Sequence, residues 1–192
     1  MSKVNFGIQD VHVAKITETN GTITYGTPFP VKGAVSLNVD PEGGDATPFY
    51  ADNIVYYMVP ATNNGYSGDL ELAITPEEFL TQILGQEIDD NDVIFESTDD
   101  KIARFALLFQ AQGDDKNKRF CFYDCTAQRP SRTNSTKTEG VDVGTETISI
   151  TMNPRTSDRI VKSFIEENED NSTVYEGWFN QVYEKQTEGS GV

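Results

Sequence analysis

The chain has 192 residues, of which 31 are acidic and 15 basic, and its formal net charge is −16. That length suits one domain with its own core, and hydrophobic residues at 36% are too frequent for a disordered chain. Affinity for a DNA backbone comes mainly from Lys and Arg, so this charge argues against a protein that grips nucleic acid.

Compartment and redox state can also be predicted from the sequence. No apolar run approaches the ~20 residues that cross a bilayer, and the first residues lack the apolar region of a secretory signal. We therefore expect a cytosolic protein with no membrane partner.

Cys121 and Cys125 lie four positions apart on one predicted strand, so their α-carbons should be about 13 Å apart. A disulfide needs less than about 7 Å, so we expect two small buried side chains on one face of the strand.

Alternation of apolar and polar residues predicts half-buried strands in the first third of the chain. Residues 10–26 predict two strands around an Asn20-Gly21 turn, since both residues accept positive φ. Residues 33–40 predict a strand, residues 40–48 a polar flexible loop, and residues 50–61 an aromatic strand. The strand over residues 33–40 should bury one alternating set, namely Val35, Leu37 and Val39.

A capped helix is predicted next. Residues 63–68 predict a turn into a strand over residues 69–74, which should bury Leu70, Leu72 and Ile74. Thr75 is a natural N-cap, Pro76 suits the first helical position, and Glu78 completes a capping box. Gly85 should end the helix. The helix should present one apolar stripe, formed by Phe79, Leu80, Ile83 and Leu84.

The rest of the chain predicts more strands and a second helix. An acidic connection leads to paired strands over residues 103–112 and 119–128, followed by a flexible loop over residues 129–144. Further strands are predicted over residues 145–153, with Ile148, Ile150 and Met152 inward, and over residues 159–168. A helix over residues 172–185 should be capped by Thr173 and Glu176, with an apolar stripe of Val174, Tyr175, Trp178, Phe179 and Val182. The predicted fold is α+β and mainly β. We expect one domain over residues 1–185, followed by a disordered tail over residues 186–192. The domain should be an antiparallel β-sandwich or barrel flanked by a short helix, with a second helix at its C-terminus.

Few residues predict chemistry. The single histidine, His12, alternates with Val11 and Val13, so we expect it to face solvent and not to serve as a catalytic base. With 31 acidic residues, a pair of carboxylates cannot be singled out for general acid–base work. The acidic segment over residues 89–96 lacks the central Gly of an EF-hand loop. We expect no enzyme activity, no metal and no cofactor.

An aromatic strand left on a sheet edge aggregates unless it is paired, and pairing with identical neighbours is the controlled form of that contact. We expect residues 40–53 to reach an adjacent subunit or ring. If they do, deletion of residues 42–46 should leave folded monomers that do not polymerise. The predicted subunit-interface residues are Asp40, Glu42, Phe49, Tyr50, Asp52, Asn53 and Tyr56.

Four segments, in order along the chain, resemble the major tail protein family of long-tailed bacteriophages, which form the tail tube. They are "FYADN" (residues 49–53), residues 65–85, residues 104–130 and "WFNQVY" (residues 178–183). The resemblance implies a tail-tube fold and hexameric rings that stack into a conduit for DNA ejection. It also implies contacts with itself and with tape-measure, initiator and terminator proteins, in the virion tail after assembly in the host cytoplasm.

We further hypothesise that part of the −16 charge lines the lumen, so that DNA passes without specific binding. Two other functions stay open. One is a β-sandwich module that recognises carbohydrate or peptide, with Tyr56, Tyr57 and Tyr66 as a stacking surface. The other is an enzyme that relies on carboxylates alone.

Overall fold

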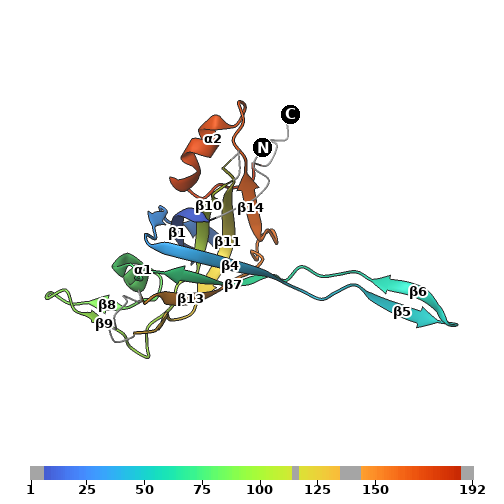
Figure 1. The fold of residues 1–192 in the computed structure, drawn as a ribbon, viewed down its shortest axis with the longest axis horizontal. Helices are drawn as coiled ribbons and strands as arrows, with labels where there is room; N and C mark the ends of the chain where they lie inside the picture. The colour runs from blue at the N-terminus through green and yellow to red at the C-terminus, as the bar shows by residue number, and fades with distance from the viewer. Residues whose placement is uncertain (1–6, 114–116, 135–143, 187–192) are drawn as a thin grey trace, which may run out of the picture.

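The computed structural model describes residues 7–113, 117–134 and 144–186 of the chain (Figure 1). Most of the predicted tail over residues 186–192 and most of the predicted loop over residues 129–144 therefore lie outside the described residues. Ten strands of the described chain form one antiparallel sheet, and its main path runs β2-β1-β10-β11-β13-β7-β4. The mainly-β prediction is confirmed. The strands of this path are β1 (Ile8–Thr19), β2 (Thr22–Tyr25), β4 (Ala34–Glu42), β7 (Gly65–Leu72), β10 (Phe105–Ala111), β11 (Arg119–Ala127) and β13 (Glu146–Met152).

Shorter elements complete the fold. Three of them pair with the main sheet: β3 (Phe29–Pro30) with β1, β12 (Ser131–Arg132) with β13, and β14 (Lys162–Ile165) with β11. Two separate hairpins are formed by β5 (Thr47–Ala51) with β6 (Ile54–Val59), and by β8 (Glu87–Ile88) with β9 (Ile94–Phe95). The helices are α1 (Glu77–Gln82) and α2 (Ser172–Glu176), the latter continued by a 3-10 turn (Gly177–Phe179).

The sheet has a core on each face. The larger core collects buried residues of β1, β7, β10, β11 and β13, and α1 closes it with Phe79 as predicted. The helix ends earlier than predicted, at Gln82 with Ile83 as its C-cap, and Gly85, at φ +78, lies two residues beyond that cap. The smaller core lies under α2 and its 3-10 turn, where Trp178 and Val182 cover Ala106, Leu108 and Cys121. Among the described residues, no helix is long and apolar enough to cross a membrane.

The two cysteines are both buried, as expected, but they do not share a face. Cys121 belongs to the core under α2, whereas Cys125 belongs to the larger core. The register between β10 and β11 shifts between Phe105 and Leu107, because Phe105 pairs with Cys125 and Leu107 with Phe122. The extra residue in β11 is a β-bulge, which moves all following side chains to the opposite face. The sequence prediction assumed an uninterrupted strand and was therefore wrong.

The predicted helix caps are also wrong. Pro76, not Thr75, occupies the N-cap of α1, and no side chain caps it. Thr75 instead donates hydrogen bonds from its backbone N–H (2.9 Å) and from its hydroxyl to the carboxylate of Glu146. At α2 the N-cap is Asn171, again with no side-chain cap bond. A side chain that could cap a helix can instead bond to a tertiary partner. Thr75 bonds to the carboxylate of Glu146, 71 positions away, and therefore does not cap α1.

Two side chains predicted to be buried are exposed. A bulge between Ala34 and Ser36 separates Val35 from Leu37 and Val39, so that Val35 is 52% exposed. Ile74 is 69% exposed because β7 ends at Leu72.

Candidate functional site

The most prominent feature of the molecule is a two-stranded arm formed by residues 42–64, which projects from the sheet between β4 and β7 (Figure 1). Its strands stay paired beyond the sheet, since Asn64 N–H donates to Glu42 O (2.8 Å) and Thr62 N–H to Gly44 O (2.9 Å). The β5–β6 ladder continues to the tip. At about 3.3 Å per residue, the ten steps from Glu42 to the tip extend about 33 Å.

Residues at the tip and at the base of the arm determine its backbone conformation. At the tip, Asp52 and Asn53 have φ of 50° and 62°, the pair of positive values that a two-residue hairpin turn requires. At the base, Gly65 has φ +106, and a Cβ there would lie 2.1 Å from the carbonyl oxygen of Met152. Only glycine fits this position, where the returning strand enters the sheet.

Three predictions are corrected here. The loop expected over residues 40–48 is mostly strand, and the strand expected over residues 50–61 is broken by the Asp52-Asn53 turn. The turn expected over residues 63–68 is also wrong, because β7 begins at Gly65.

Both faces of the arm are apolar. Opposed residues of a hairpin share a face, and Phe49 pairs with Tyr57 while Pro48 pairs with Met58. The first face comprises Phe49, Ala51, Ile54, Tyr57 and Val59, the second comprises Pro48, Tyr50, Val55 and Met58, and Tyr56 is the extra residue of a bulge in β6. The large apolar side chains of the arm are 47–73% exposed, with Tyr56 the most exposed. The apolar side chains of both faces can be shielded from water only if other surfaces pack against both faces of the arm.

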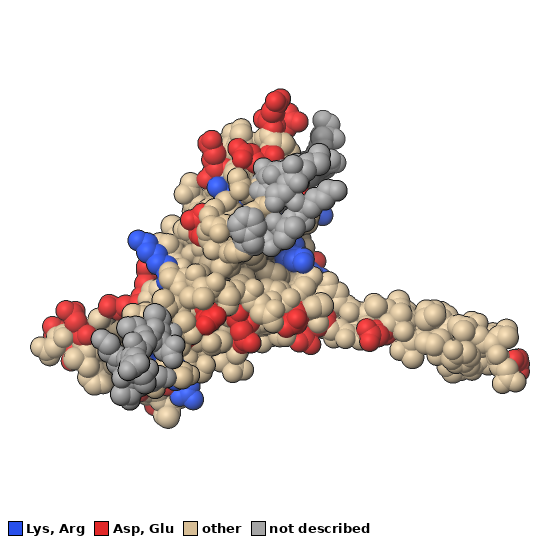
Figure 2. Space-filling model, viewed as in Figure 1, with Lys and Arg blue, Asp and Glu red and all other residues tan. Residues whose placement is uncertain are grey.

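The arm carries charge of one sign. Within residues 42–64 the charged side chains are Glu42, Asp45 and Asp52, with no Lys or Arg. Figure 2 shows the arm as mostly uncharged surface with red only at scattered points. A surface that receives the arm should therefore be apolar and neutral or basic.

A second surface, here called the acidic face, is formed by the outward side chains of β4, β7 and β13. The registers align them in three rows across the strands, and these strands contain no Lys or Arg. Red side chains line the lower side of the body in Figure 2. The rows are Ser36, Glu71 and Thr147; Asn38, Asp69 and Ser149; and Asp40, Ser67 and Thr151.

Hydroxyl groups, rather than cations, hold the carboxylates of the acidic face. Ser36 (2.9 Å) and Thr145 (2.7 Å) donate to Glu71, and Ser149 (2.6 Å) donates to Asp69. The hydrogen bonds from Thr145 and then Ser36 lower the pKa of Glu71, so its carboxylate stays ionised. This face is therefore an ordered and negatively charged surface.

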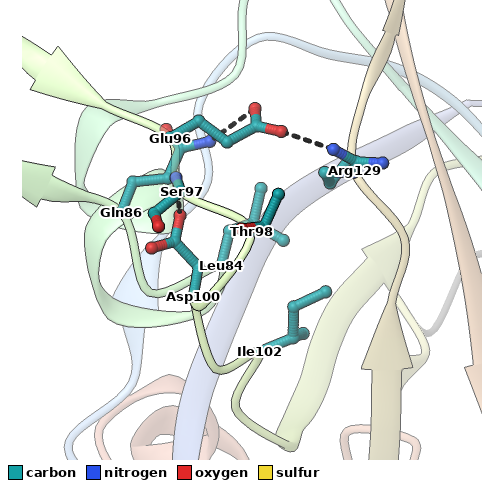
Figure 3. A pocket seen from close by; sticks show the side chains of 8 residues that line it. All are labelled: Leu84, Gln86, Glu96, Ser97, Thr98, Asp100, Ile102 and Arg129. Atoms are coloured by element: carbon teal, nitrogen blue, oxygen red, sulfur yellow. Dashed lines mark hydrogen bonds and ion pairs between the residues drawn. The ribbon is translucent and has the colours of Figure 1, made fainter.

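One surface pocket lies beside the loop that follows β9. It is lined by Leu84, Gln86, Glu96, Asp100, Ile102 and Arg129, together with Ser97 and Thr98 (Figure 3). Both carboxylate oxygens of Glu96 are occupied, by Arg129 (2.7 Å) and Gln86 (3.2 Å). Asp100 accepts a hydrogen bond from Ser97 N–H (2.9 Å) and so closes its own loop. These polar groups hold the loop after β9 in place.

His12 does not face solvent as predicted. Its ring stacks on Phe179 of the 3-10 turn, with 4.7 Å between centroids, and its Nδ1 lies 2.9 Å from the carbonyl oxygen of Asp10. The side chain is half-buried between β1 and the C-terminal segment. It therefore serves to dock the 3-10 turn onto the sheet.

The predicted interface residues lie together on the arm or at its base. Asp40 and Glu42 are on β4, Phe49 and Tyr50 on β5, and Tyr56 on β6. Asp52 and Asn53 form the turn, and all of these residues are exposed. The prediction missed the remaining exposed side chains of the arm because residues 50–61 were taken as one strand. The Asp-Asn pair between two apolar runs was the available signal for a hairpin. The missed residues are Ile54, Val55, Tyr57, Met58 and Val59.

Comparisons with known proteins add one structural similarity. No protein-family model matches the chain, and no curated protein matches it. A solved structure to which the chain is similar is the cryo-EM structure of the anti-feeding prophage cap, the AFP tube terminating cap. The TM-score is 0.43 with 10% sequence identity, over 85% of this chain and 94% of that chain. A similarity of this size assigns no function, so the arm and the acidic face have to carry any functional conclusion.

Proposed function

We propose that the protein is a structural subunit of a bacteriophage tail tube, which self-assembles into stacked rings around a conduit for DNA. The observation that carries this proposal is the arm, which exposes apolar side chains on both faces. Its partner is a second copy of the same chain. The motif resemblance to major tail proteins supports the same role, which is structural and needs neither a cofactor nor a catalytic step.

The energetics of the arm favour assembly. A two-stranded hairpin alone is marginally stable in water. Burial of one Val-, Leu- or Phe-sized side chain contributes about 1.5–3 kcal/mol, and the arm offers eight large apolar side chains for burial. An arm that leaves its own body and inserts into a different surface of another copy makes a heterologous contact. Such contacts close into rings or propagate into filaments, and a tail tube needs both geometries.

The acidic face suits the wall of a DNA conduit. Its carboxylates are held by hydroxyl groups and its strands carry no cation, so it repels phosphates. We place this face toward the bore, where it would let DNA slide without being held. Tape-measure, initiator and terminator proteins are the further partners that this role requires, and the virion tail is its location.

Electron microscopy of arm-deleted protein tests the proposal. Residues 45–61 are replaced by Asn-Gly, which closes the ladder where Gly44 and Thr62 already pair. Wild-type protein at high concentration, with nucleating tail proteins, should form rings or tubes, whereas the arm-deleted protein should stay monomeric with unchanged circular dichroism. A wild-type protein that never assembles under these conditions would overturn the proposal, as would tubes formed without the arm.

The recognition-module alternative relies on the same tyrosines. Tyr56 and Tyr57 lie on the arm, whereas Tyr66 lies in β7 against Phe122 and Lys162, so the three tyrosines do not form one stacking surface. Uniform small particles that bind a glycan or peptide array through these residues would favour that alternative.

A further inference from the structure

The sheet has an open slot beside β14. This strand pairs with Arg119–Phe122, the first half of β11, and β13 occupies the same side of β11 farther along, at Cys125–Ala127. Within the described chain, no strand pairs with the other edge of β14. An edge of this kind presents unpaired backbone N–H and C=O groups to an incoming strand.

A stripe of aromatic rings leads from the larger core to this edge. Phe122 stacks on Phe109 (6.3 Å between centroids), Phe109 on Phe120 (5.1 Å), and Phe120 contacts Phe164 of β14 (6.0 Å). The stripe ends in the ring of Phe164, which is 58% exposed. The outermost ring therefore offers an apolar surface continuous with the core.

Two lysines flank the exposed ring. The Nζ of Lys162 lies 4.4 Å from the ring centroid of Tyr66, and Lys162 forms no ion pair with the described residues. Lys118 lies 5.9 Å from the ring centroid of Phe164 and pairs with Glu166 at 2.8 Å. The edge of β14 thus combines an exposed ring with a cation that has no carboxylate partner in the described chain.

We propose that the edge of β14 receives the arm of a neighbouring copy. A strand of that arm adds to the backbone of β14, one apolar face of the arm covers Phe164, and the carboxylates of the arm lie near Lys162. This inference rests on the proposed function and names its receiving surface. Charge complementarity supports it, because the arm carries only acidic charges and this edge carries Lys162. Strand addition is a general way to dock an extended segment, with backbone bonds for affinity and side chains for specificity.

The arm of the same chain does not fit this slot. It leaves the sheet at Gly65, next to Tyr66 and hence close to Lys162, and then runs away from the body for about 33 Å (Figure 1). Its tip can reach another molecule but not the edge near its own base.

Photo-cross-linking within assembled tubes tests the inference. Phe164 is replaced by p-benzoyl-phenylalanine, and this variant is added as a minor, isotope-labelled fraction to wild-type protein, so that the tubes form normally. Mass spectrometry should find cross-links from position 164 to residues 47–59 of an unlabelled copy. The same probe at Ile74 is the matched control. Ile74 is exposed and lies just after the end of β7 that is far from Tyr66, so a probe there should not reach the arm.

The outcomes separate the two proposals. Tubes whose cross-links from position 164 lie elsewhere, or within the labelled chain, would overturn the β14 receiver and leave the tube role intact. Absence of wild-type tubes would overturn the tube role itself. As a second test, Lys162→Glu should slow assembly at low salt at least about fivefold, while Lys32→Glu, the same charge change at an exposed position, should not. Equal rates for both variants would contradict the inference.

Discussion

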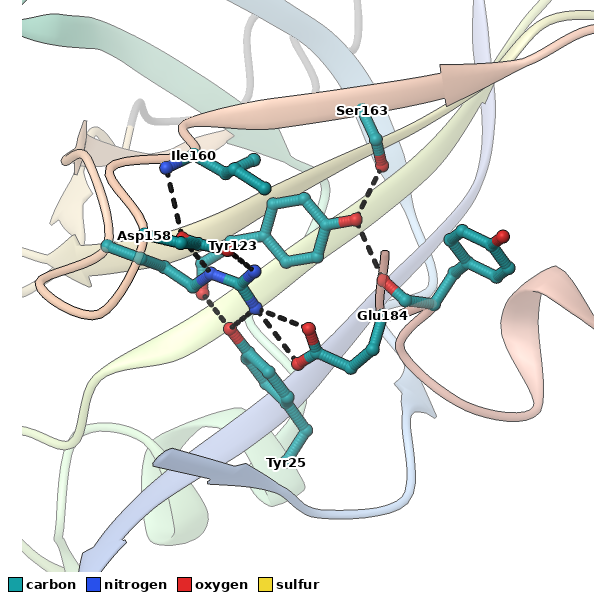
Figure 4. A network of polar contacts seen from close by, with 8 residues as sticks. Tyr25, Tyr123, Asp158, Ile160, Ser163 and Glu184 are labelled. Carbon is teal, nitrogen blue, oxygen red and sulfur yellow. Dashed lines mark hydrogen bonds and ion pairs between the residues drawn. The ribbon is translucent and has the colours of Figure 1, made fainter. Parts of the chain in front are cut away.

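The guanidinium of Arg155 binds the carboxylate of Glu184 with two hydrogen bonds, 2.9 Å and 2.7 Å from Nη1 to the two oxygens (Figure 4). The same guanidinium donates to Asp158 and to the hydroxyl of Tyr25 (3.3 Å), and it lies 4.4 Å from the ring of Tyr123. The hydroxyl of Tyr123 in turn donates to Tyr183 O (2.8 Å). This network joins the segment after α2 to the sheet.

Arg155→Met should therefore destabilise the fold. The variant removes the guanidinium that donates hydrogen bonds to Tyr25, Asp158 and Glu184. We expect a loss of about 1–3 kcal/mol in the free energy of unfolding, measured in urea. Arg159→Met is the matched control, since Arg159 is exposed; its effect should stay within about 0.5 kcal/mol. Equal effects of the two substitutions would show that the network does not stabilise the protein.

Glu146 should make stability depend on pH in the acid range. Burial raises the pKa of Glu146, but the hydrogen bonds from Thr75 and Arg132 outweigh it and lower the pKa below its ordinary value of 4.5. Its contribution is therefore fully present above pH 4.5 and is lost as pH falls through the lowered value in the folded state. Glu146→Gln should cost about 1–3 kcal/mol at pH 7 and flatten the acid limb of thermal unfolding. An unchanged acid limb would rule this out.

Gly65→Ala should be far more damaging than Gly21→Ala. Both glycines have positive φ, but a Cβ at Gly65 would collide with Met152 O at 2.1 Å, while a Cβ at Gly21 meets nothing within 4 Å. Backbone strain alone costs about 1 kcal/mol at Gly21, and the collision adds to it at Gly65. Thermal denaturation of both variants measures the difference, and a Gly65→Ala variant as stable as Gly21→Ala would contradict the geometry at the arm's base.

Both faces of the arm should be needed for assembly. We expect that a variant with Phe49→Ser and Tyr57→Ser, and one with Tyr50→Ser and Val55→Ser, both fold normally, because these side chains are exposed in the monomer. Each should raise the critical concentration for tube formation, measured by sedimentation, at least about tenfold, since each removes burial worth about 2 kcal/mol or more. Assembly unaffected by either variant would show that only one face is buried.

Charge reversal on the acidic face should make the tube retain DNA. Asp69→Lys with Glu71→Lys adds cations where the wild-type strands have none, so labelled DNA should bind the variant tubes at low salt and be released at high salt. Tubes that bind no DNA in either form would remove this face from the bore. Asp90→Lys with Asp92→Lys, in the exposed β8–β9 hairpin, gives the matched control.

Local patterns predicted much of the secondary structure. The Asn20-Gly21 hairpin, the strands near residues 103–112 and 119–128, and the inward set Ile148, Ile150 and Met152 are all confirmed. These features depend on φ preferences and on alternation within a few residues, which the sequence displays directly. The predicted helix caps and the shared face of Cys121 and Cys125 failed, because a distant carboxylate and a bulge decided them.

The sequence alone determined that this chain forms antiparallel strands, that it is strongly acidic, and that residues 49–59 are too apolar and aromatic for an ordinary loop. Only the tertiary structure decided where those residues lie. An apolar strand can be buried by its own domain or left outside it, and the choice depends on long-range registers that no local pattern contains. Here the chain leaves the sheet after Glu42 and returns to it at Gly65, and the hairpin between them extends beyond the reach of its own core. Its side chains can therefore be buried only by other molecules.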